Sequence, residues 1–300
     1  MGHVQAKLIQ LPSLRGMKEV GMRLLSPRRR APGIYVRSKL NALPANPRRG
    51  SRQQFELSIG RVPLRLQMSD RQLFIAASER YSAFSDSTAR PVRIRLNEGA
   101  PRESVLPEFG YEFEGAVLSA FANEIRFDGV ENQYALDSMI RVFLTWKLLS
   151  HSGFLLHAAT VMRSGKAYIF MGRSGAGKST VASLSPEGSV LTDEISLLRR
   201  ENGVWRAYGT PFWGEFRAAG SNTSAPVAGV FRLLQATENR VEALRPVAIL
   251  RALLPNVLFF SAEAAANRRL LDILSEAAEE VPGYNLAFRK NRSFWEVLPP

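Results

Sequence analysis

Alternating apolar and polar positions mark the first patterned part of the chain. Three stretches, 55–59, 64–68 and 92–96, alternate in this way, which is typical of half-buried antiparallel strands. Residues 73–81 between them suit a short helix. The pattern predicts a small β-rich accessory domain over residues 53–130, within which no group of chemically reactive residues stands out.

A helical spacing of apolar residues follows over residues 132–150. Apolar side chains recur there at intervals of three and four residues, which places them on one face of an amphipathic helix. They are Leu136, Met139, Ile140, Phe143, Leu144 and Leu148. The stripe predicts core packing and no ligand site.

Two apolar runs, 154–162 and 167–171, then predict a β-hairpin whose second strand leads into a glycine-rich segment. That segment matches G-x-x-x-x-G-K-[ST], the phosphate-binding loop of nucleotide-binding proteins. Its residues are Gly172, Arg173, Ser174, Gly175, Ala176, Gly177, Lys178, Ser179 and Thr180. A strand directly before the motif is the structural context that such a loop requires.

The spacing of this motif has a chemical reason. Phosphates are wrapped by successive backbone N–H groups, and residues without a Cβ atom, here Gly172, Gly175 and Gly177, let the main chain come close enough. Lys178 would neutralise the β and γ oxygens of ATP, and the Ser179 hydroxyl would bind Mg²⁺. Arg173 would contact either the γ-phosphate or solvent.

The segment after the loop contains a pair of acids. The helix of the loop can run only from Lys178 to about Leu184, because Ser185-Pro-Glu-Gly188 ends it. A strand over 189–193 follows, and this short crossover predicts that Asp193 and Glu194 lie at the mouth of the phosphate site. A carboxylate there suits Mg²⁺.

The remaining patterns predict an alternation of strands and helices. A hairpin with its turn at Asn202-Gly203 joins strands 195–198 and 204–208, and an aromatic loop with one acid, Glu215, comes next. Strands are predicted at 230–234 and 241–244, helices at 245–254 and 261–280 with Ser261 as cap, and edge strands at 284–288 and 293–297. Residues 131–300 are thus predicted to form an α/β catalytic domain.

Charge is concentrated at one end of the sequence. The 300 residues carry a formal net charge of +13, but residues 1–50 hold eleven Lys or Arg against one acid, which is +10. Residues 1–52 are therefore predicted to be a basic, loosely structured arm. The arm is either a solvated extension or a docking element for an acidic partner such as RNA or anionic lipid. Because the body carries little net charge, nucleic acid is disfavoured as the main partner.

Composition narrows the location and the chemistry. The chain has no Cys and three His, which disfavours disulfides and zinc sites. No apolar run has the length of a signal peptide core or a membrane span, so a cytoplasmic protein without a transmembrane segment is expected. A homo-oligomer is compatible with the sequence.

A histidine-bearing strand (156–159), the hairpin, the loop motif, and paired acids fifteen residues after Lys178 resemble a known family. Together they resemble the catalytic domain of HPr serine kinase/phosphorylase and its relatives, which share a fold with ATP-dependent phosphoenolpyruvate carboxykinase. The resemblance covers about residues 132–298. It implies an α/β fold with a P-loop-containing mixed sheet of that type, together with the smaller β-rich N-terminal region.

The resemblance also implies roles for individual residues. Asp193 would be the base that takes the proton from the acceptor hydroxyl, with His157 oriented beside it. Ser179, Glu194 and Asp193 are the candidate Mg²⁺ ligands, and Lys178 acts on the phosphates. From the residues alone, His157 is a candidate for either a core histidine of an apolar strand or a residue of the site.

The chain departs from the pattern of that family in three ways. It has Asp193-Glu194 where two aspartates are typical, Thr180 where an acid is typical, and no downstream Arg/Gly-rich signature of the phosphorylase reaction. Divergent relatives act as kinases on peptides or small proteins. A Mg²⁺- and ATP-dependent kinase acting on a Ser/Thr-type hydroxyl of such an acceptor is therefore expected, and the alternative is a switch or scaffold that binds ATP or GTP without acceptor chemistry.

Overall fold

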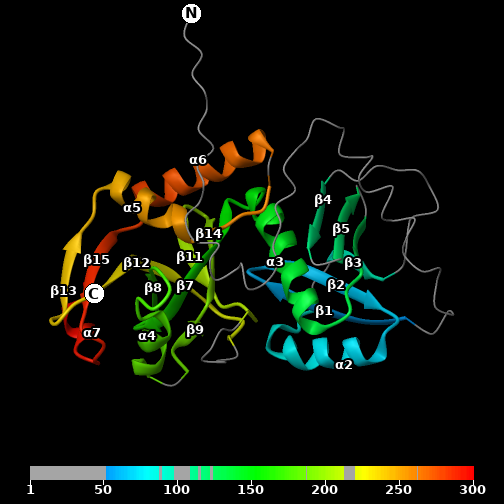
Figure 1. The fold of residues 1–300 in the computed structure, drawn as a ribbon, viewed down its shortest axis with the longest axis horizontal. Helices are drawn as coiled ribbons and strands as arrows, with labels where there is room; N and C mark the ends of the chain where they lie inside the picture. The colour runs from blue at the N-terminus through cyan, green and yellow to red at the C-terminus, as the bar shows by residue number, and fades with distance from the viewer. Residues whose placement is uncertain are drawn as a thin grey trace, which may run out of the picture.

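The fold combines helices with two mixed β-sheets. The computed structural model describes residues 52–87, 90–97, 109–113, 116–121, 124–186, 188–212, 220–261 and 263–300. The expected α/β class is confirmed at this level. Residues 1–51 of the predicted basic arm and Glu215 lie outside the described residues. Figure 1 shows the two sheets side by side, with α3 (Gln133–Leu149) between them.

The first sheet has six strands within the described residues, in the order β1-β2-β3-β6-β5-β4. They are β1 (Gln53–Ile59), β2 (Val62–Met68), β3 (Val92–Leu96), β4 (Phe109–Phe113), β5 (Ala116–Phe121) and β6 (Glu124–Asp128). Strands β1 and β2 pair antiparallel as predicted, but β3 runs parallel to β2 and β6. The antiparallel prediction for β3 is wrong because α2 (Arg71–Arg80), which is followed by the short helix η2 (Ser82–Phe84), carries the chain back before β3 begins.

The second sheet has nine strands within the described part of the chain. They are β7 (Gly153–Arg163), β8 (Lys166–Met171), β9 (Val190–Thr192), β10 (Ile195–Glu201), β11 (Val204–Tyr208), β12 (Ser224–Gln235), β13 (Arg240–Ala243), β14 (Val257–Leu258) and β15 (Gly283–Phe288). The main path runs β11-β10-β7-β8-β12-β15-β13. The first residues of β12 also pair with β11, so the strands from β11 through β12 form a closed ring. The predicted hairpins β7–β8 and β10–β11 are both antiparallel.

Helices cover both faces of the second sheet near β8. Ile169 and Met171 of β8 point into a core with α5 (Pro246–Leu253) and α6 (Ala264–Glu280), which lie along one side of the sheet in Figure 1. Tyr168 and Phe170 point into a second core with α4 (Lys178–Leu184) and α7 (Phe294–Val297). Because β8 is buried on both faces, the loop that follows it begins from a fixed position.

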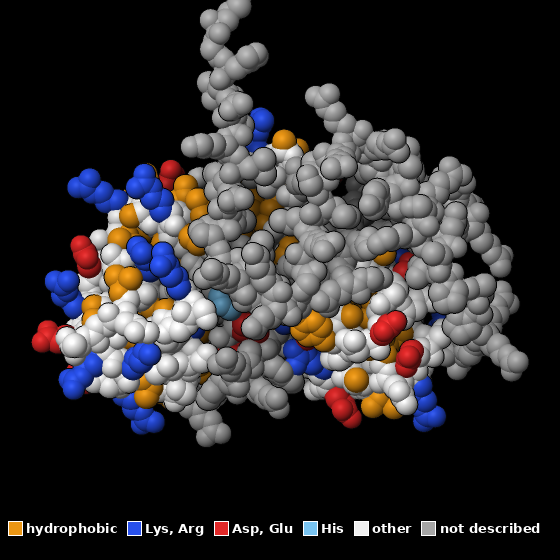
Figure 2. All heavy atoms as spheres, in the orientation of Figure 1, with side chains coloured by type: hydrophobic (Ala, Val, Ile, Leu, Met, Phe, Trp, Pro, Cys, Tyr) orange, Lys and Arg blue, Asp and Glu red, His pale blue; other side chains and the backbone are white. Residues whose placement is uncertain are grey.

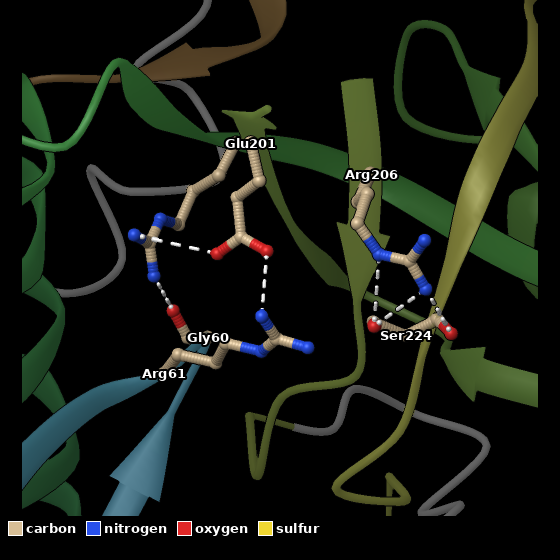
Figure 3. A network of polar contacts seen from close by, with 6 residues as sticks. Gly60, Arg61, Glu201, Arg206 and Ser224 are labelled. Carbon is tan, nitrogen blue, oxygen red and sulfur yellow. Dashed lines mark hydrogen bonds and ion pairs between the residues drawn. The ribbon is translucent and has the colours of Figure 1, made fainter. Parts of the chain in front are cut away.

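The two sheets share one hydrophobic core. The apolar stripe of α3 packs with the first sheet, and Leu155, Ile195 and Leu197 of the second sheet belong to the same cluster. The predicted core role of the stripe is thus confirmed. Polar contacts add to this junction: Figure 3 shows Glu201 accepting from Arg61 at 3.0 Å, and Arg199 donates to the carbonyl oxygen of Gly60 in the β1–β2 turn.

Three predictions near the C-terminus are wrong. Residues 293–297 do not form a strand: Phe294–Val297 form the one-turn helix α7, because the buried ring of Phe294 packs against Phe288 and Phe170. Strand β15 is not an edge strand, since β13 pairs with it on its outer side. Helix α6 begins at Ala264 and not at Ser261, whose hydroxyl accepts from the amide of Glu263. The short helix η3 (Leu254–Asn256) follows α5.

No helix of the described residues is long and apolar enough to cross a membrane.

Candidate functional site

The predicted phosphate-binding loop joins β8 to α4. β8 ends at Met171 and α4 begins at Lys178, as the sequence predicts. Gly177 has a φ angle of 115°, and a Cβ atom there would lie 2.9 Å from Cε1 of Phe288. Gly175 has a φ angle of 77° and open space around it. Glycine at both positions is therefore required by the backbone, and at Gly177 also by the packing.

Few contacts fix the tip of the loop. The side-chain amide of Gln235, the last residue of β12, donates a 2.7 Å hydrogen bond to the carbonyl oxygen of Gly175. Arg173, Ser174 and Gly175 are exposed, so this tip faces solvent. Of the two hydroxyl residues that open α4, Ser179 is exposed and Thr180 is half-buried. Sequence reasoning did not single out Gln235, because its pairing with the loop depends on the parallel contact of β12 with β8.

Lys178 is buried within its own loop. Its side chain is 8% exposed, and Nζ donates a 3.0 Å hydrogen bond to the carbonyl oxygen of Gly172. Burial lowers the pKa of Lys178, and the charge of Glu194 acts in the opposite direction. A phosphate anion would provide this desolvated ammonium group with the counter-charge that the interior lacks.

The acidic pair occupies an interruption in one strand path. Strands β9 and β10 both pair antiparallel with β7, and Asp193 and Glu194 form the two-residue break between them. Ala158 of β7 donates from its amide to the carbonyl oxygen of Glu194 at 3.0 Å. The acids therefore do not lie on the strand beside β8, because β7 separates the two. They nevertheless lie close enough for the charges of Glu194 and Lys178 to interact.

Hydroxyl groups hold this interruption in place. Thr210 donates a 2.6 Å hydrogen bond to the carbonyl oxygen of Ile195, directly after the acidic pair. On the other side, the amide of Glu194 donates to the hydroxyl of Thr192 at 3.5 Å. Asp193 is 3% exposed and Glu194 is half-buried. Burial raises the pKa of Glu194, and the nearest cations, Arg141 first, oppose this effect.

His157 lies on the strand between the loop and the acids. It is opposite Ile195 in the β7–β10 pairing, one residue before the contact of Ala158 with Glu194. Burial lowers its pKa to about 4, and the positive charges of Lys178 and Arg141 act in the same direction. His157 is therefore neutral near pH 7 and can accept a hydrogen bond there.

The residues present fit a magnesium ion that arrives with a nucleotide. No group of three or more His, Asp or Glu side chains forms a metal site among the described residues. Mg²⁺ needs no such cage, because it commonly takes one or two carboxylates together with phosphate oxygens and water. Asp193 and Glu194 have carboxylates of this kind, and the exposed Ser179 has a hydroxyl in the first turn of α4.

Residues 130–299 match the family described as SynChlorMet cassette protein ScmC. The chain belongs to this ScmC family. The match covers more than half of the 300 residues and includes the loop, His157 and both acids. No curated protein matches the sequence. The family description names neither a ligand nor a reaction.

The ScmC region also includes α3, which brings further charged groups to the site. Arg141 of α3 lies near His157 and Glu194, since its charge lowers the pKa of both. One turn earlier on α3, Asp137 accepts from Arg80 at 2.5 Å and from the hydroxyl of Tyr81. Arg80 and Tyr81 come from the N-terminal region outside the ScmC match. The sequence pattern of α3 predicted its apolar stripe but not the polar residues Asp137 and Arg141.

Positive charge on the visible surface is dispersed. Figure 2 shows Lys and Arg side chains scattered over the C-terminal half, among apolar and uncharged groups, with acidic side chains between them. A nucleic-acid-binding surface is expected to have a continuous basic stripe. On this face, the Lys and Arg side chains of the described residues form no such stripe.

Proposed function

We propose that this ScmC-family protein is a Mg²⁺-ATP-dependent kinase that transfers the γ-phosphoryl group to a Ser/Thr-type hydroxyl of a peptide or small protein. The observation that carries the proposal is the position of Ala158, the residue after His157: it bonds Glu194 and lies opposite Met171, the last residue before the loop, and the charges of Lys178 and Glu194 interact there. A loop that only bound phosphate would need the lysine and the glycines. A buried acid, a half-buried acid and a neutral histidine close together are the parts that phosphoryl transfer additionally needs.

The roles follow from position and charge. Lys178 and the backbone amides of the loop would hold the phosphates of ATP, and Ser179 with Glu194 and Asp193 would hold Mg²⁺. The bound ion supplies neutralisation of charge on the β and γ oxygens. Asp193 would take the proton of the acceptor hydroxyl, and neutral His157 would accept a hydrogen bond beside it.

Support for an HPr kinase-like arrangement is topological. The strand before the loop, β8, has an antiparallel partner directly before it in sequence, and that partner carries the histidine. We propose the HPr kinase/phosphoenolpyruvate carboxykinase type of fold for residues 131–300 on this ground. Since ATP is held inside cells, we place the activity in the cytoplasm.

The experiment has two parts. Mg²⁺-ATP binding is measured by calorimetry, with GTP as competitor, and [γ-³²P]ATP is then incubated with the protein and a lysate of its source. The proposal predicts a labelled polypeptide whose phosphate resists acid and hydroxylamine, as a phosphate ester of Ser or Thr does. A K178A variant run in parallel must lose the label.

Two outcomes would contradict the proposal in different ways. Tight nucleotide binding with no labelled polypeptide would favour a nucleotide-dependent switch or scaffold. Absence of binding to either nucleotide would remove the phosphate-loop interpretation itself.

A further inference from the structure

Arg141 is a charged residue near the site that the proposed mechanism does not use. It lies on α3, the helix that packs against β7 on the side of the first sheet. Its guanidinium Cζ lies 5.0 Å from the ring centre of Phe212, which is fully buried. The arginine is half-buried, and its Nε has no hydrogen-bond partner among the described residues.

The nearest acid on the same helix does not serve Arg141. Asp137, one turn earlier, accepts from Arg80 through Oδ2 and from Tyr81 and Gln133 through Oδ1. These three donors use both oxygens of the carboxylate. An arginine four residues after an aspartate on a helix can form an ion pair with it. Because both oxygens of Asp137 already accept hydrogen bonds from other residues, Arg141 does not depend on Asp137 as its counter-charge.

The groups that Arg141 influences belong to the candidate site. Its charge reaches His157 on β7 and Glu194 in the β9–β10 break, and Lys178 reaches the same two residues from the loop. Two cations from different elements, α3 and the phosphate loop, therefore act on the same two residues. Lys178 lies on the phosphate-loop side, and Arg141 comes from the side of α3 and the first sheet.

Charge balance indicates what Arg141 is for. Arg80 forms an ion pair with Asp137, and the charges of Arg141, Arg80 and Lys178 all act on Glu194, next to Asp193. When Glu194 and Asp193 bind Mg²⁺, their charge is directed to the metal, and Lys178 and Arg141 are released to interact with phosphate oxygens. Guanidinium is well suited to this task because its planar donors match phosphate in a bidentate manner.

We propose that Arg141 binds the terminal phosphoryl group of the nucleotide, opposite Lys178. The inference rests on the proposed function of the site. Arg141, which lies on α3 and outside the loop motif, would distinguish a triphosphate from a diphosphate. The same cation would stabilise the negative charge that develops during phosphoryl transfer.

The test compares the affinities of the full-length protein for Mg²⁺-ATP and Mg²⁺-ADP. Wild type, R141M, R141K and the control K147M, which removes a cation from the same helix, are measured by calorimetry. We expect R141M to weaken ATP binding about tenfold to a hundredfold, because a charged hydrogen-bonding group is lost, and to change ADP binding less than about threefold. R141K should fall between wild type and R141M, and K147M should match wild type.

Each other outcome overturns the inference in a recognisable way. Equal changes for ATP and ADP, or no change for either, would make Arg141 a structural residue that only packs on Phe212. Wild-type protein that binds neither nucleotide would refute the proposed function and this inference with it. Retained ADP binding shows that R141M is folded, and if R141M does not fold, the ratio of ATP to ADP affinity in R141K decides.

Discussion

The amide of Ala158 donates a 3.0 Å hydrogen bond to the backbone carbonyl oxygen of Glu194. This bond ties the acidic pair to the residue that follows His157, so one strand pairing sets the position of all three side chains. The phosphate loop begins after Met171 of the adjacent hairpin strand β8, and Met171 lies directly opposite Ala158. The candidate site thus consists of a strand interruption next to a loop, and each part can be tested separately.

Lys178→Ala should remove most of the nucleotide affinity without unfolding the protein. The lysine donates within its own loop to Gly172 and is desolvated, so its loss removes a phosphate contact more than a packing contact. We expect Mg²⁺-ATP affinity to fall at least about tenfold and the free energy of unfolding to change by less than about 1 kcal/mol.

Lys166→Ala is the matched control for this change. Lys166 is an exposed lysine on the same hairpin and should leave both quantities unchanged. Unchanged ATP affinity in K178A would refute the phosphate-loop assignment.

Gly177→Ala should destabilise the protein more than Gly203→Ala. Both glycines have a positive φ angle, 115° and 81°, but only at Gly177 would a Cβ meet a ring, that of Phe288. We expect a loss of about 1–2 kcal/mol at Gly203 from backbone strain. At Gly177 overpacking adds to this, for a total of about 2–5 kcal/mol. Urea unfolding of the two variants measures the difference. Equal losses in the free energy of unfolding would show that the ring of Phe288 moves aside at no cost.

His157 should make stability depend on pH. Its pKa is lowered to about 4 in the folded state from an ordinary value of 6.5, so the unfolded chain binds the proton first as pH falls. This contribution to stability is complete above about pH 6.5 and is lost as the pH falls toward 4. Wild type should therefore lose about 2 kcal/mol more than H157Q between about pH 7.5 and pH 5.

Urea unfolding at the two pH values measures this effect. His151, whose pKa burial also lowers, provides the comparison, and H151Q should retain the His157 contribution. Parallel pH profiles for wild type and H157Q would place His157 in a solvated environment.

Local sequence signals predicted the central elements well. The bounds of α4 follow from the glycine spacing on one side and from the Ser-Pro-Glu-Gly segment on the other, both short-range features. The turn at Asn202-Gly203 likewise has positive φ at both residues, as an Asn-Gly hairpin requires. Within these segments the chemistry of each residue restricts its own backbone.

Features that depend on long-range pairing were not predicted. Arg141 reaches the site because α3 packs on β7, and Gln235 reaches the loop because β12 runs parallel to β8. The direction of β3 and the break at Asp193 and Glu194 are likewise set by neighbours distant in sequence. Periodicity shows which residues are buried, but it does not show which elements lie next to one another.

The acidic pair carries the difference between a kinase and a binding switch. Glu194, half-buried beside Lys178, is proposed to hold Mg²⁺, so Glu194→Gln should weaken Mg²⁺-ATP binding. Asp193 is proposed to take the proton of the acceptor, and Asn is nearly the same size but cannot do so. General-base assistance is worth about 10²–10⁴ in rate.

The most direct test is therefore the rate of phosphoryl transfer by Asp193→Asn, measured with labelled ATP together with its Mg²⁺-ATP affinity. The account predicts near-normal affinity with transfer reduced at least about a hundredfold, and a milder reduction for His157→Ala. Loss of Mg²⁺-ATP binding in Asp193→Asn, with Glu194→Gln still active, would reverse the two roles. Unchanged transfer in both variants would contradict the kinase mechanism.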